Sequence, residues 1–347
     1  MNTETSSKPS VLQDEEIIFF PTSASIMETE KTWLIPIHGW IFKSMDKSGW
    51  KRELMEEIFS NLDFLYPDRD ASALINRLGL FLVDNVESKK IRVLINGREH
   101  ITPFSIANGH FNGQILIKTE KLAPVPEWIN YEAVLKKQDL RHYKGMVQLI
   151  RPEGISVITD VDDTIKVSQV TDKKELIANT FLREFRPVEG MNSVFNNWRG
   201  KGYVFHYVSA SPWQLYPFLE EFREKNGFPQ GSFHLKYFRL KDETFFNLFM
   251  SAETYKSEII PSILKEYPKR KFILVGDSGE KDPEVYAQLL KEYPGQVKHV
   301  FIRQISPDQN ETERLVQIFN DANKNSWTLF QHPEELLEWH GASLSHD

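Results

Sequence analysis

The sequence predicts an α/β fold in which a parallel sheet has helices on both faces and is preceded by a smaller β-rich domain. After residue 154, short β-prone runs alternate with helical stretches, which is typical of such a sheet. Before it, apolar runs and turn signals follow one another with few helical patterns. A length of 347 residues is sufficient for two domains. We expect a disordered tail over 1–15, the β-rich domain over 16–150 and the α/β domain over 151–347.

The composition narrows the class of protein. Hydrophobic residues make up 40% and aromatic residues 12%, as in ordinary globular proteins. A formal charge of -7 argues against a general nucleic-acid binder, and the absence of Cys excludes disulfides and thiolate chemistry. Residues 1–16 are polar, and no apolar run reaches the roughly 20 residues that span a bilayer. We therefore expect a cytoplasmic protein that is at most peripheral to a membrane.

In the first domain, runs of apolar and β-branched residues predict strands over 17–20, 33–42, 111–117 and 143–150. A tight hairpin is predicted over 91–104, because Asn96-Gly97 accepts the positive φ values of a two-residue turn. Between these strands, apolar residues repeat at helical spacing from Leu54 to Leu62, which predicts an amphipathic helix that packs on the core. A stripe that binds a partner is the alternative for this helix.

In the second domain, strands are predicted over 157–159, 203–208, 232–237, 272–275, 299–302 and 327–330, and helices over 213–225, 255–266, 283–292 and from Pro333 onward. Ligands of such sheets bind at the carboxyl ends of the strands. The basic run 269–271 enters its strand from the opposite end, so we expect it to be solvated surface.

Acidic residues gather at two of these carboxyl ends. Asp160, Asp162 and Asp163 follow the first strand, and the segment from Asp277 to Asp282 follows the fourth. Clustered acids repel one another, so a cation or a shared proton is needed to hold them together. The pattern predicts one divalent metal site with a spare carboxylate beside it, an arrangement that suits phosphoryl transfer.

The residue types suggest roles for the acids. An ionised Asp160 can attack phosphorus, while Asp162 can protonate the departing alkoxide and later accept a proton from water. A calcium loop of the EF-hand type would need Gly and Glu where Ile165 and Thr171 stand, so that interpretation fails. A plain solvated acidic turn is the remaining alternative.

Further candidates lie at neighbouring strand ends. Gly276 allows close backbone approach, and Asp282 before Pro283 is expected to cap the following helix and to reach a metal through water. Ser211 is expected to be an N-cap as well, whereas Ser209 at the strand tip is free to donate to a phosphoryl oxygen. Lys256 is the best-placed cation for a charged transition state, with a surface lysine as the alternative.

Together, these residues resemble the four motifs of the haloacid dehalogenase superfamily: Asp160-Val-Asp162-Asp163-Thr164, Ser209, Lys256 and Gly276 to Asp282. The resemblance implies a Rossmann-like, haloacid dehalogenase-like domain over about residues 150–330. Residues 158–165, 206–213 and 272–286 resemble one branch more closely, the actin-patch-associated magnesium-dependent phosphatidate phosphatases and their bacterial relatives. The segment 33–40, with Pro36-Ile37-His38-Gly39-Trp40, also looks like the amino-terminal part of those proteins.

The resemblance implies that Asp160 is a nucleophile that forms an aspartyl-phosphate and that Asp162 is the general acid and base. It further implies phosphate binding by Thr164, Ser209 and Lys256. Magnesium would be held by the Asp160 carboxylate, the Asp162 backbone carbonyl and Asp277, and Asp282 is the ligand expected to reach it through water.

The size of the substrate is inferred from the segments that could cover the predicted active site. Superfamily members that act on small metabolites usually carry a cap domain, but the segments 165–202 and 238–254 are short. An open site suits a large or membrane-held substrate, and the apolar segment 245–250 is expected to contact acyl chains or a bilayer, or else to pack on the first domain. The leading interpretation is magnesium-dependent hydrolysis of phosphatidate to diacylglycerol and phosphate. The alternatives are a phosphatase of phosphoproteins or other phosphomonoesters, and a non-catalytic membrane or cytoskeletal adaptor.

Overall fold

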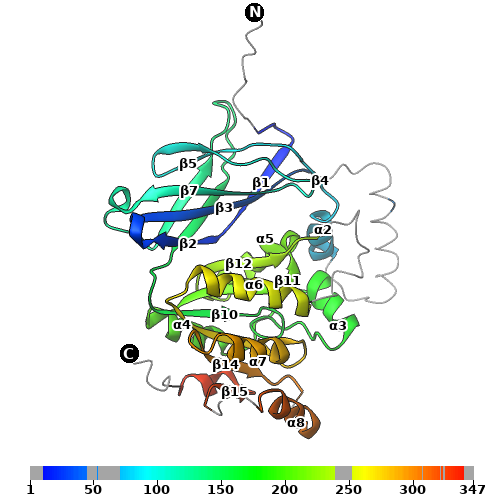
Figure 1. Cartoon of the computed structure of the whole chain (residues 1–347). Helices are drawn as coiled ribbons and strands as arrows, with labels where there is room; N and C mark the ends of the chain where they lie inside the picture. Colours follow the sequence, from blue (N-terminus) through cyan, green and yellow to red (C-terminus); the bar gives the residue numbers. More distant parts are fainter. Residues whose placement is uncertain are drawn as a thin grey trace, which may run out of the picture. The chain divides into compact units, whose positions relative to one another are not determined.

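A computed structural model of the chain (Figure 1) describes residues 11–44, 53, 71–238, 252–306, 308–320, 322 and 325–339. The predicted helix near residues 54–62 and the apolar segment 245–250 lie outside the described residues. The chain divides into two compact units, one of residues 1–55 and 79–151, the other of residues 56–78 and 152–347.

The first unit is a nine-stranded sheet in the order β1-β3-β2-β9-β8-β5-β6, with β4 and β7 paired to β3. Its strands are β1 (Glu15–Phe20), β2 (Thr22–Met27), β3 (Thr32–Lys43), β4 (Asp84–Asn85), β5 (Arg92–Ile95), β6 (Arg98–Ile101), β7 (His110–Lys118), β8 (Trp128–Ala133) and β9 (Lys144–Leu149). Buried apolar residues from strands along this order, from β1 to β5, form one hydrophobic core. Val11 is buried in that core and β1 begins at Glu15, so ordered structure starts before residue 15, where the sequence predicted a tail.

The hairpin prediction is confirmed. Strands β5 and β6 pair antiparallel from Arg92–Ile101 to Ile95–Arg98, and the two turn residues have positive φ values of 48° at Asn96 and 70° at Gly97. Strands β2 and β8 were not predicted from the sequence. The residues of β2 are small and polar for half its length, so its hydrophobic pattern is weak.

The second unit is a six-stranded, all-parallel sheet in the order β12-β11-β10-β13-β14-β15. Its strands are β10 (Ile155–Thr159), β11 (Val204–Pro212), β12 (Gly231–Lys236), β13 (Lys271–Asp277), β14 (Val297–Arg303) and β15 (Trp327–Phe330). The chain moves outward from β10 to β11 and β12, then returns to β13 on the other side of β10. This reversal makes the gap between β10 and β13 a topological switch point, where ligands of such sheets bind.

Helices cover both faces of this sheet, as predicted (Figure 1). The α-helices among the described residues are α2 (Ala71–Gly79), α3 (Lys173–Ile177), α4 (Met191–Gly200), α5 (Tyr216–Lys225), α6 (Ala252–Glu266), α7 (Asp282–Glu292) and α8 (Gln309–Ile318). Helix α4 packs on one face, where the rings of Phe195 and Phe205 lie 5.1 Å apart, and α6 and α7 pack together on the other. Strands β10 and β13 are buried over nearly their whole lengths, as expected for central strands of a doubly covered sheet.

The expectation that residues 269–271 are all solvated surface is wrong for Arg270. Its guanidinium is buried at the amino end of the sheet, where Nε donates to Ser156 Oγ (2.8 Å) and Nη2 donates to the Ile155 carbonyl (2.6 Å). Nη1 donates to the Glu153 carbonyl at 2.5 Å. Arg270 therefore joins the start of β13 to the start of β10, at the end opposite the acidic clusters.

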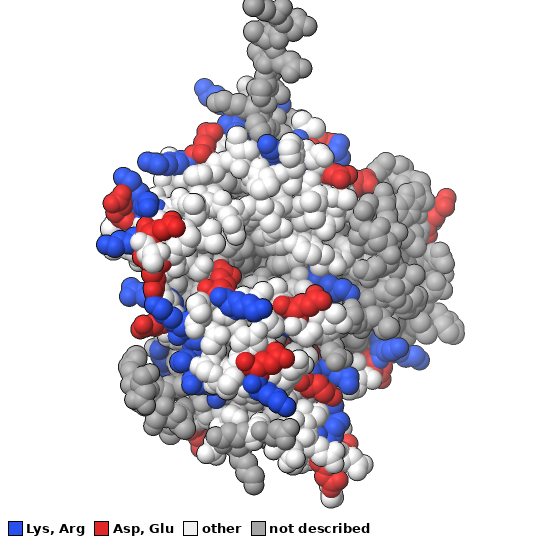
Figure 2. Space-filling model, viewed as in Figure 1, with Lys and Arg blue, Asp and Glu red and all other residues white. Residues whose placement is uncertain are grey.

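On the face seen in Figure 2, charged side chains of the first unit lie mainly along its edges, and both signs are mixed over the second unit. Among the described residues, no helix has the length and apolar character needed to cross a membrane.

Candidate active site

The two acidic clusters meet at the switch point of the second sheet. Asp160 follows β10 directly, and its backbone N–H donates to the carbonyl of Val275 on β13 at 2.9 Å. Asp277 is the last residue of β13. Both side chains are buried, Asp160 at 1% exposed and Asp277 at 0%. Parallel pairing of the two strands thus brings together carboxylates that are 117 positions apart in the sequence.

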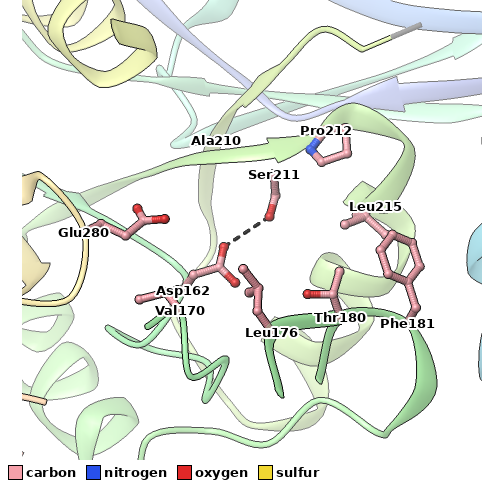
Figure 3. A pocket seen from close by; sticks show the side chains of 10 residues that line it. All are labelled: Asp162, Val170, Leu176, Thr180, Phe181, Ala210, Ser211, Pro212, Leu215 and Glu280. Atoms are coloured by element: carbon pink, nitrogen blue, oxygen red, sulfur yellow. Dashed lines mark hydrogen bonds between the residues drawn. The ribbon is translucent and has the colours of Figure 1, made fainter. Parts of the chain in front are cut away.

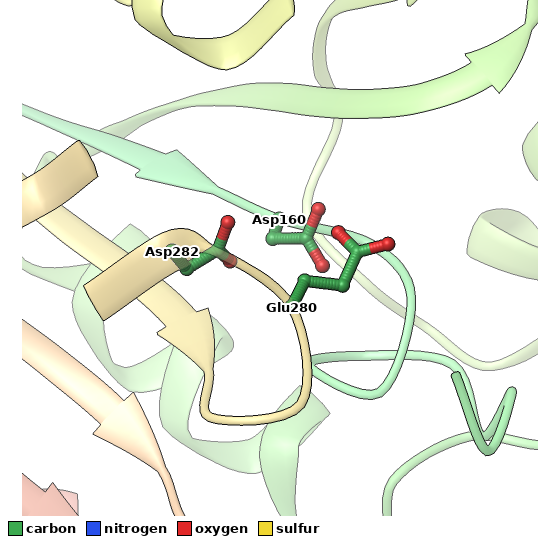
Figure 4. Close-up of side chains that lie close together, drawn as sticks. All are labelled: Asp160, Glu280 and Asp282. Atoms are coloured by element: carbon green, nitrogen blue, oxygen red, sulfur yellow. The ribbon is translucent and has the colours of Figure 1, made fainter. Parts of the chain in front are cut away.

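Lys256 supplies the cation inside this cluster. Its Nζ lies 2.7 Å from Asp160 Oδ1 and 3.0 Å from Glu280 Oε2, and it also forms an ion pair with Asp282. Figure 4 shows the three carboxylates, which have one oxygen each within 4.8 Å of the others. Lys256 is 1% exposed, so the alternative of a surface lysine is wrong. Helix α6, which carries Lys256, was predicted at this place.

The charges in the cluster are unbalanced. Burial raises the pKa of Asp160, and the neighbouring carboxylates of Asp282, Glu280 and Asp277 raise it further, while Lys256 opposes them. Burial also raises the pKa of Asp277 and of Glu280. For Lys256, burial lowers the pKa, but the surrounding carboxylates outweigh it and the net shift is upward. One ammonium group therefore faces several carboxylates, and its single positive charge does not neutralise them. A further cation would balance the remaining negative charge.

Two buried carboxylate oxygens fit that additional charge. Asp277 Oδ1 accepts hydrogen bonds from the amides of Gly279 (2.7 Å) and Glu280 (3.3 Å), which fix the side chain. Asp277 Oδ2 and Asp160 Oδ2 are buried and have no hydrogen-bond partner among the described residues. A buried hydrogen-bond acceptor without a partner destabilises the fold. Carboxylate oxygens are the ligands that a hard divalent cation such as Mg²⁺ prefers.

Asp282 does not cap the helix that follows it, which corrects the prediction. It is the first residue of α7, the N-cap position is Lys281, and the Asp282 side chain points back into the cluster. Its Oδ2 accepts from the Asp277 amide at 3.4 Å while Oδ1 pairs with Lys256. The prediction for Gly276 is confirmed, because a Cβ there would lie only 2.3 Å from Asp282 Oδ2.

Asp162 is held separately from this cluster, by its own cation. Lys166 Nζ lies 2.7 Å from Asp162 Oδ1, and the hydroxyl of Ser168 donates to the same oxygen at 2.6 Å. The hydroxyls of Ser209 and Ser211 each donate to Oδ2 at 3.1 Å. Burial raises the pKa of Asp162, but Lys166 and these hydrogen bonds outweigh it and lower the pKa to about 2. Asp162 is therefore ionised at neutral pH in the substrate-free site.

Ser209 and Ser211 reach Asp162 because β11 continues to Pro212 and its pairing with β12 shifts register between Ser209 and Pro212. An irregularity of this kind changes the direction of side chains, and it is common beside active sites. The predicted N-cap role of Ser211 is therefore wrong: the hydroxyl contacts Asp162, and the N-cap of α5 is Leu215. Ser209 lies where the regular pairing of β11 with β12 ends, three residues before the end of the strand, and its hydroxyl is not free as predicted, because it donates to Asp162.

The third acid of the first motif, Asp163, has a structural role. It has a φ of 51°, and its carboxylate accepts hydrogen bonds from three backbone amides: Ser168 (2.8 Å), Gln169 (2.9 Å) and Val170 (2.7 Å). It thereby fixes the flap, by which we mean residues 165–188, whose two ends pair through Val167 with Arg186 and Val188 with Ile165. Thr164 is fully buried beside it, and its hydroxyl has no hydrogen-bond partner among the described residues.

A pocket opens between Asp162 and the flap (Figure 3). Asp162, Thr180, Ser211 and Glu280 supply its polar side-chain atoms, and Figure 3 shows Leu215 and Phe181 on the side away from Glu280. The remaining lining residues are Val170, Leu176, Ala210 and Pro212. The pocket therefore has a carboxylate end and an apolar end.

Four residues of this site were not predicted as functional: Lys166, Ser168, Ser211 and Glu280. Lys166 and Ser168 lie four and six positions after Asp162 in an irregular segment, so no periodicity placed them near it. Glu280 stands within the predicted acidic segment, and the only sequence signal was its position between Asp277 and Asp282.

Part of the second unit is similar to proteins of known name. Residues 155–304, which include all the acids described above, match the model of the family "Phosphatidate phosphatase APP1, catalytic domain". The predicted resemblance to phosphatidate phosphatases is thereby confirmed for this segment. Among individual proteins, the chain is 34% identical over 195 residues to phosphatidate phosphatase APP1 of Saccharomyces cerevisiae, which covers 54% of this chain and 32% of that protein.

An uncharacterized protein of Schizosaccharomyces pombe is 29% identical over 173 residues, covering 49% of this chain and 28% of that protein. The chain thus spans about a third of the length of the curated relatives it matches. Among solved structures, a bacterial ice-binding adhesin matches with 13% identity over 38% of this chain and 33% of its own, at a TM-score of 0.16. A TM-score this low carries no information about the fold.

Proposed function

We propose that the second unit is a magnesium-dependent phosphatidate phosphatase that hydrolyses phosphatidate to diacylglycerol and phosphate. The observation that carries this proposal is the buried Asp160 carboxylate, paired with Lys256 at the switch point of a segment similar to phosphatidate phosphatase catalytic domains. A binding module has no use for several buried acids of raised pKa at two neighbouring strand ends, which argues against the adaptor alternative.

In the proposed mechanism, Asp160 attacks the phosphorus atom and becomes an aspartyl-phosphate as the bond to the leaving alcohol oxygen breaks. Lys256 neutralises the nucleophile's neighbours and stands within reach of the transferring phosphoryl oxygens. Magnesium, held by Asp160 and Asp277 with Asp282 beside them, would supply electrostatic stabilisation of the phosphoryl group. The carbonyl of Asp162 is the further oxygen ligand that the family resemblance implies.

Asp162 moves the protons. In the free site it is ionised, the state required to take a proton from the water that hydrolyses the aspartyl-phosphate. To protonate the leaving alkoxide it must first become protonated itself. A bound phosphoryl group provides for this, because its oxygens compete for the Ser209 and Ser211 hydroxyls and its charge raises the pKa of a nearby carboxyl.

Phosphate release from phosphatidate in mixed micelles tests the proposal, measured with magnesium, with chelator and with Asp160→Asn. We expect metal-dependent release from the natural chain and a loss of many orders of magnitude in the variant, because uncatalysed phosphomonoester hydrolysis is extremely slow. A phosphopeptide and soluble monoesters are measured alongside. Release that is independent of Asp160 would refute the mechanism, and a phosphopeptide hydrolysed faster than phosphatidate would establish the phosphoprotein alternative.

A further inference from the structure

The pocket beside Asp162 has two chemically different ends. Because it adjoins Asp162, its position indicates which part of a substrate it would bind. Asp162 is the residue that contacts the leaving oxygen in the proposed mechanism, and it lines the pocket itself. The carbon atoms attached to that oxygen must therefore extend from Asp162 along the pocket. Towards Glu280 the space belongs to the carboxylate cluster and the phosphoryl group. The direction that remains leads to the apolar end, formed by Leu176, Phe181 and Leu215 (Figure 3).

The apolar end is preformed by contacts outside the pocket. Helix α3 is followed by a π-helical turn over Ala178–Leu182, a rare geometry that is frequent at functional sites and that here places Thr180 and Phe181 in the wall. Arg77 on α2 fixes this turn, since its Nη1 donates to the carbonyls of Thr180 (2.9 Å) and Arg183 (2.8 Å). Phe181 is 1% exposed, so its ring is held firmly within the flap.

The flap is tied to the catalytic loop at its other end as well. Asp163 accepts from the amides of residues 168–170, and Asn179 Nδ2 donates to the Ser168 carbonyl at 3.1 Å. An apolar wall held from both ends does not have to be ordered when a ligand arrives, so its contacts contribute to binding without that entropic cost.

We propose that this apolar end is the binding subsite for the leaving alcohol and that it selects phosphomonoesters whose alcohol is alkyl or acylated over those of polyols and hydrophilic peptides. The inference rests on the proposed function. It identifies Leu176, Phe181 and Leu215 as the residues that set the substrate class. A polyol would bury several hydroxyl groups against these side chains, where the Thr180 hydroxyl is the polar group of the wall, whereas alkyl carbons gain by leaving water.

The test compares n-butyl phosphate with glycerol 3-phosphate, two esters of similar size that differ in their hydroxyl groups. Binding is measured by titration calorimetry in magnesium buffer on the Asp160→Asn chain, so that no turnover is needed, and kcat/KM is measured on the chain with Asp160. We expect butyl phosphate to bind at least about 10-fold more tightly, the range in which apolar pockets discriminate.

Leu176→Asn probes the subsite with little change in volume, and Ile177→Asn is its matched control. Both residues are half-buried on α3, but only Leu176 lines the pocket. We expect Leu176→Asn to reduce the preference to about 3-fold or less and Ile177→Asn to preserve it. Val170→Asn, on another part of the lining, repeats the test if either α3 variant unfolds.

Equal binding of the two esters, or an equal loss of preference in both α3 variants, would overturn the inference. A preserved binding preference with no phosphate release from any ester by the Asp160 chain would refute the phosphatase proposal and leave the subsite supported. Phosphate release that is faster for glycerol 3-phosphate than for butyl phosphate would refute the subsite and leave a phosphatase.

Discussion

Replacing Lys256 with Met should destabilise the protein strongly, because the change removes the cation from a buried acidic cluster. The ammonium lies 2.7 Å from Asp160, 3.0 Å from Glu280 and in an ion pair with Asp282, and Lys256, Asp160 and Asp282 have side chains at most 2% exposed. Removing one partner from a buried ion pair costs about 3–5 kcal/mol, since the remaining charges have no compensation. At roughly 2–4 °C per kcal/mol for a unit of this size, the Tm should fall by about 6–20 °C.

The loss should depend on pH with a definite sign. Asp160, Asp282 and Glu280 have folded-state pKa values above their ordinary values, so the folded protein binds protons more tightly than the unfolded chain. Stability from such groups is complete below the unfolded pKa near 4 and is lost as the pH rises through the folded pKa. Lys256→Met should therefore regain stability as the pH is lowered from 8 towards 5, and added magnesium should restore part of it at pH 8.

Thermal unfolding followed by circular dichroism, with EDTA and with magnesium, checks these expectations. Lys265→Met is the matched control, because Lys265 stands on the same helix and is exposed. A Tm of Lys256→Met that stays within about 2 °C of the natural chain at pH 8 with EDTA would contradict the ion-pair geometry on which the site is built.

Three further changes test other parts of the site. Gly276→Ala should cost about 1–3 kcal/mol and abolish the rise in Tm on adding magnesium, since its Cβ would overlap buried Asp282; Gly200→Ala, whose Cβ meets open space, is the control in the same melting assay. Asp163→Ala should cost about 2–4 kcal/mol and expose the flap to limited proteolysis, because three amides lose their acceptor, whereas Asp163→Asn, which tolerates a positive φ, should lose less. Asp162 has a lowered pKa of about 2, so its contribution to stability is complete above its unfolded pKa near 4 and disappears as the pH falls to 2; Asp162→Asn should flatten that part of the Tm-against-pH curve, and an unchanged curve would contradict the Lys166 pair.

The sequence predicted the second unit well because its signals are local. Central strands such as β10 and β13 are short apolar runs, and each carries its acids immediately after it, so pattern and position agree. Because these two strands pair in parallel, their carboxyl ends lie side by side, which is sufficient to bring Asp160 close to Asp277. Lys256 was found for a similar reason, since the start of a crossover helix lies at the same edge of the sheet as the strand ends.

The misses share a physical cause, which is that tertiary contacts prevailed over a local pattern. Ser211-Pro212 and Asp282-Pro283 both read as helix starts, but in each case the side chain contacts a buried charge instead of a helix amide. Arg270 looked like part of a basic surface run, yet it is buried and donates to three acceptors on β10 and on the residues just before it. Lys166 gave no signal, because a lone lysine in a loop is normally exposed and only the folded loop shows its carboxylate partner.

The turn from Asp160 to Asp163 connects two parts of the molecule that differ in kind. One end carries Asp160, the proposed nucleophile, and the other, three residues later, accepts hydrogen bonds from the amides that anchor the flap. A change that loosens residues 168–170, such as the loss of the Asp163 carboxylate, would therefore also loosen the backbone that carries Asp160.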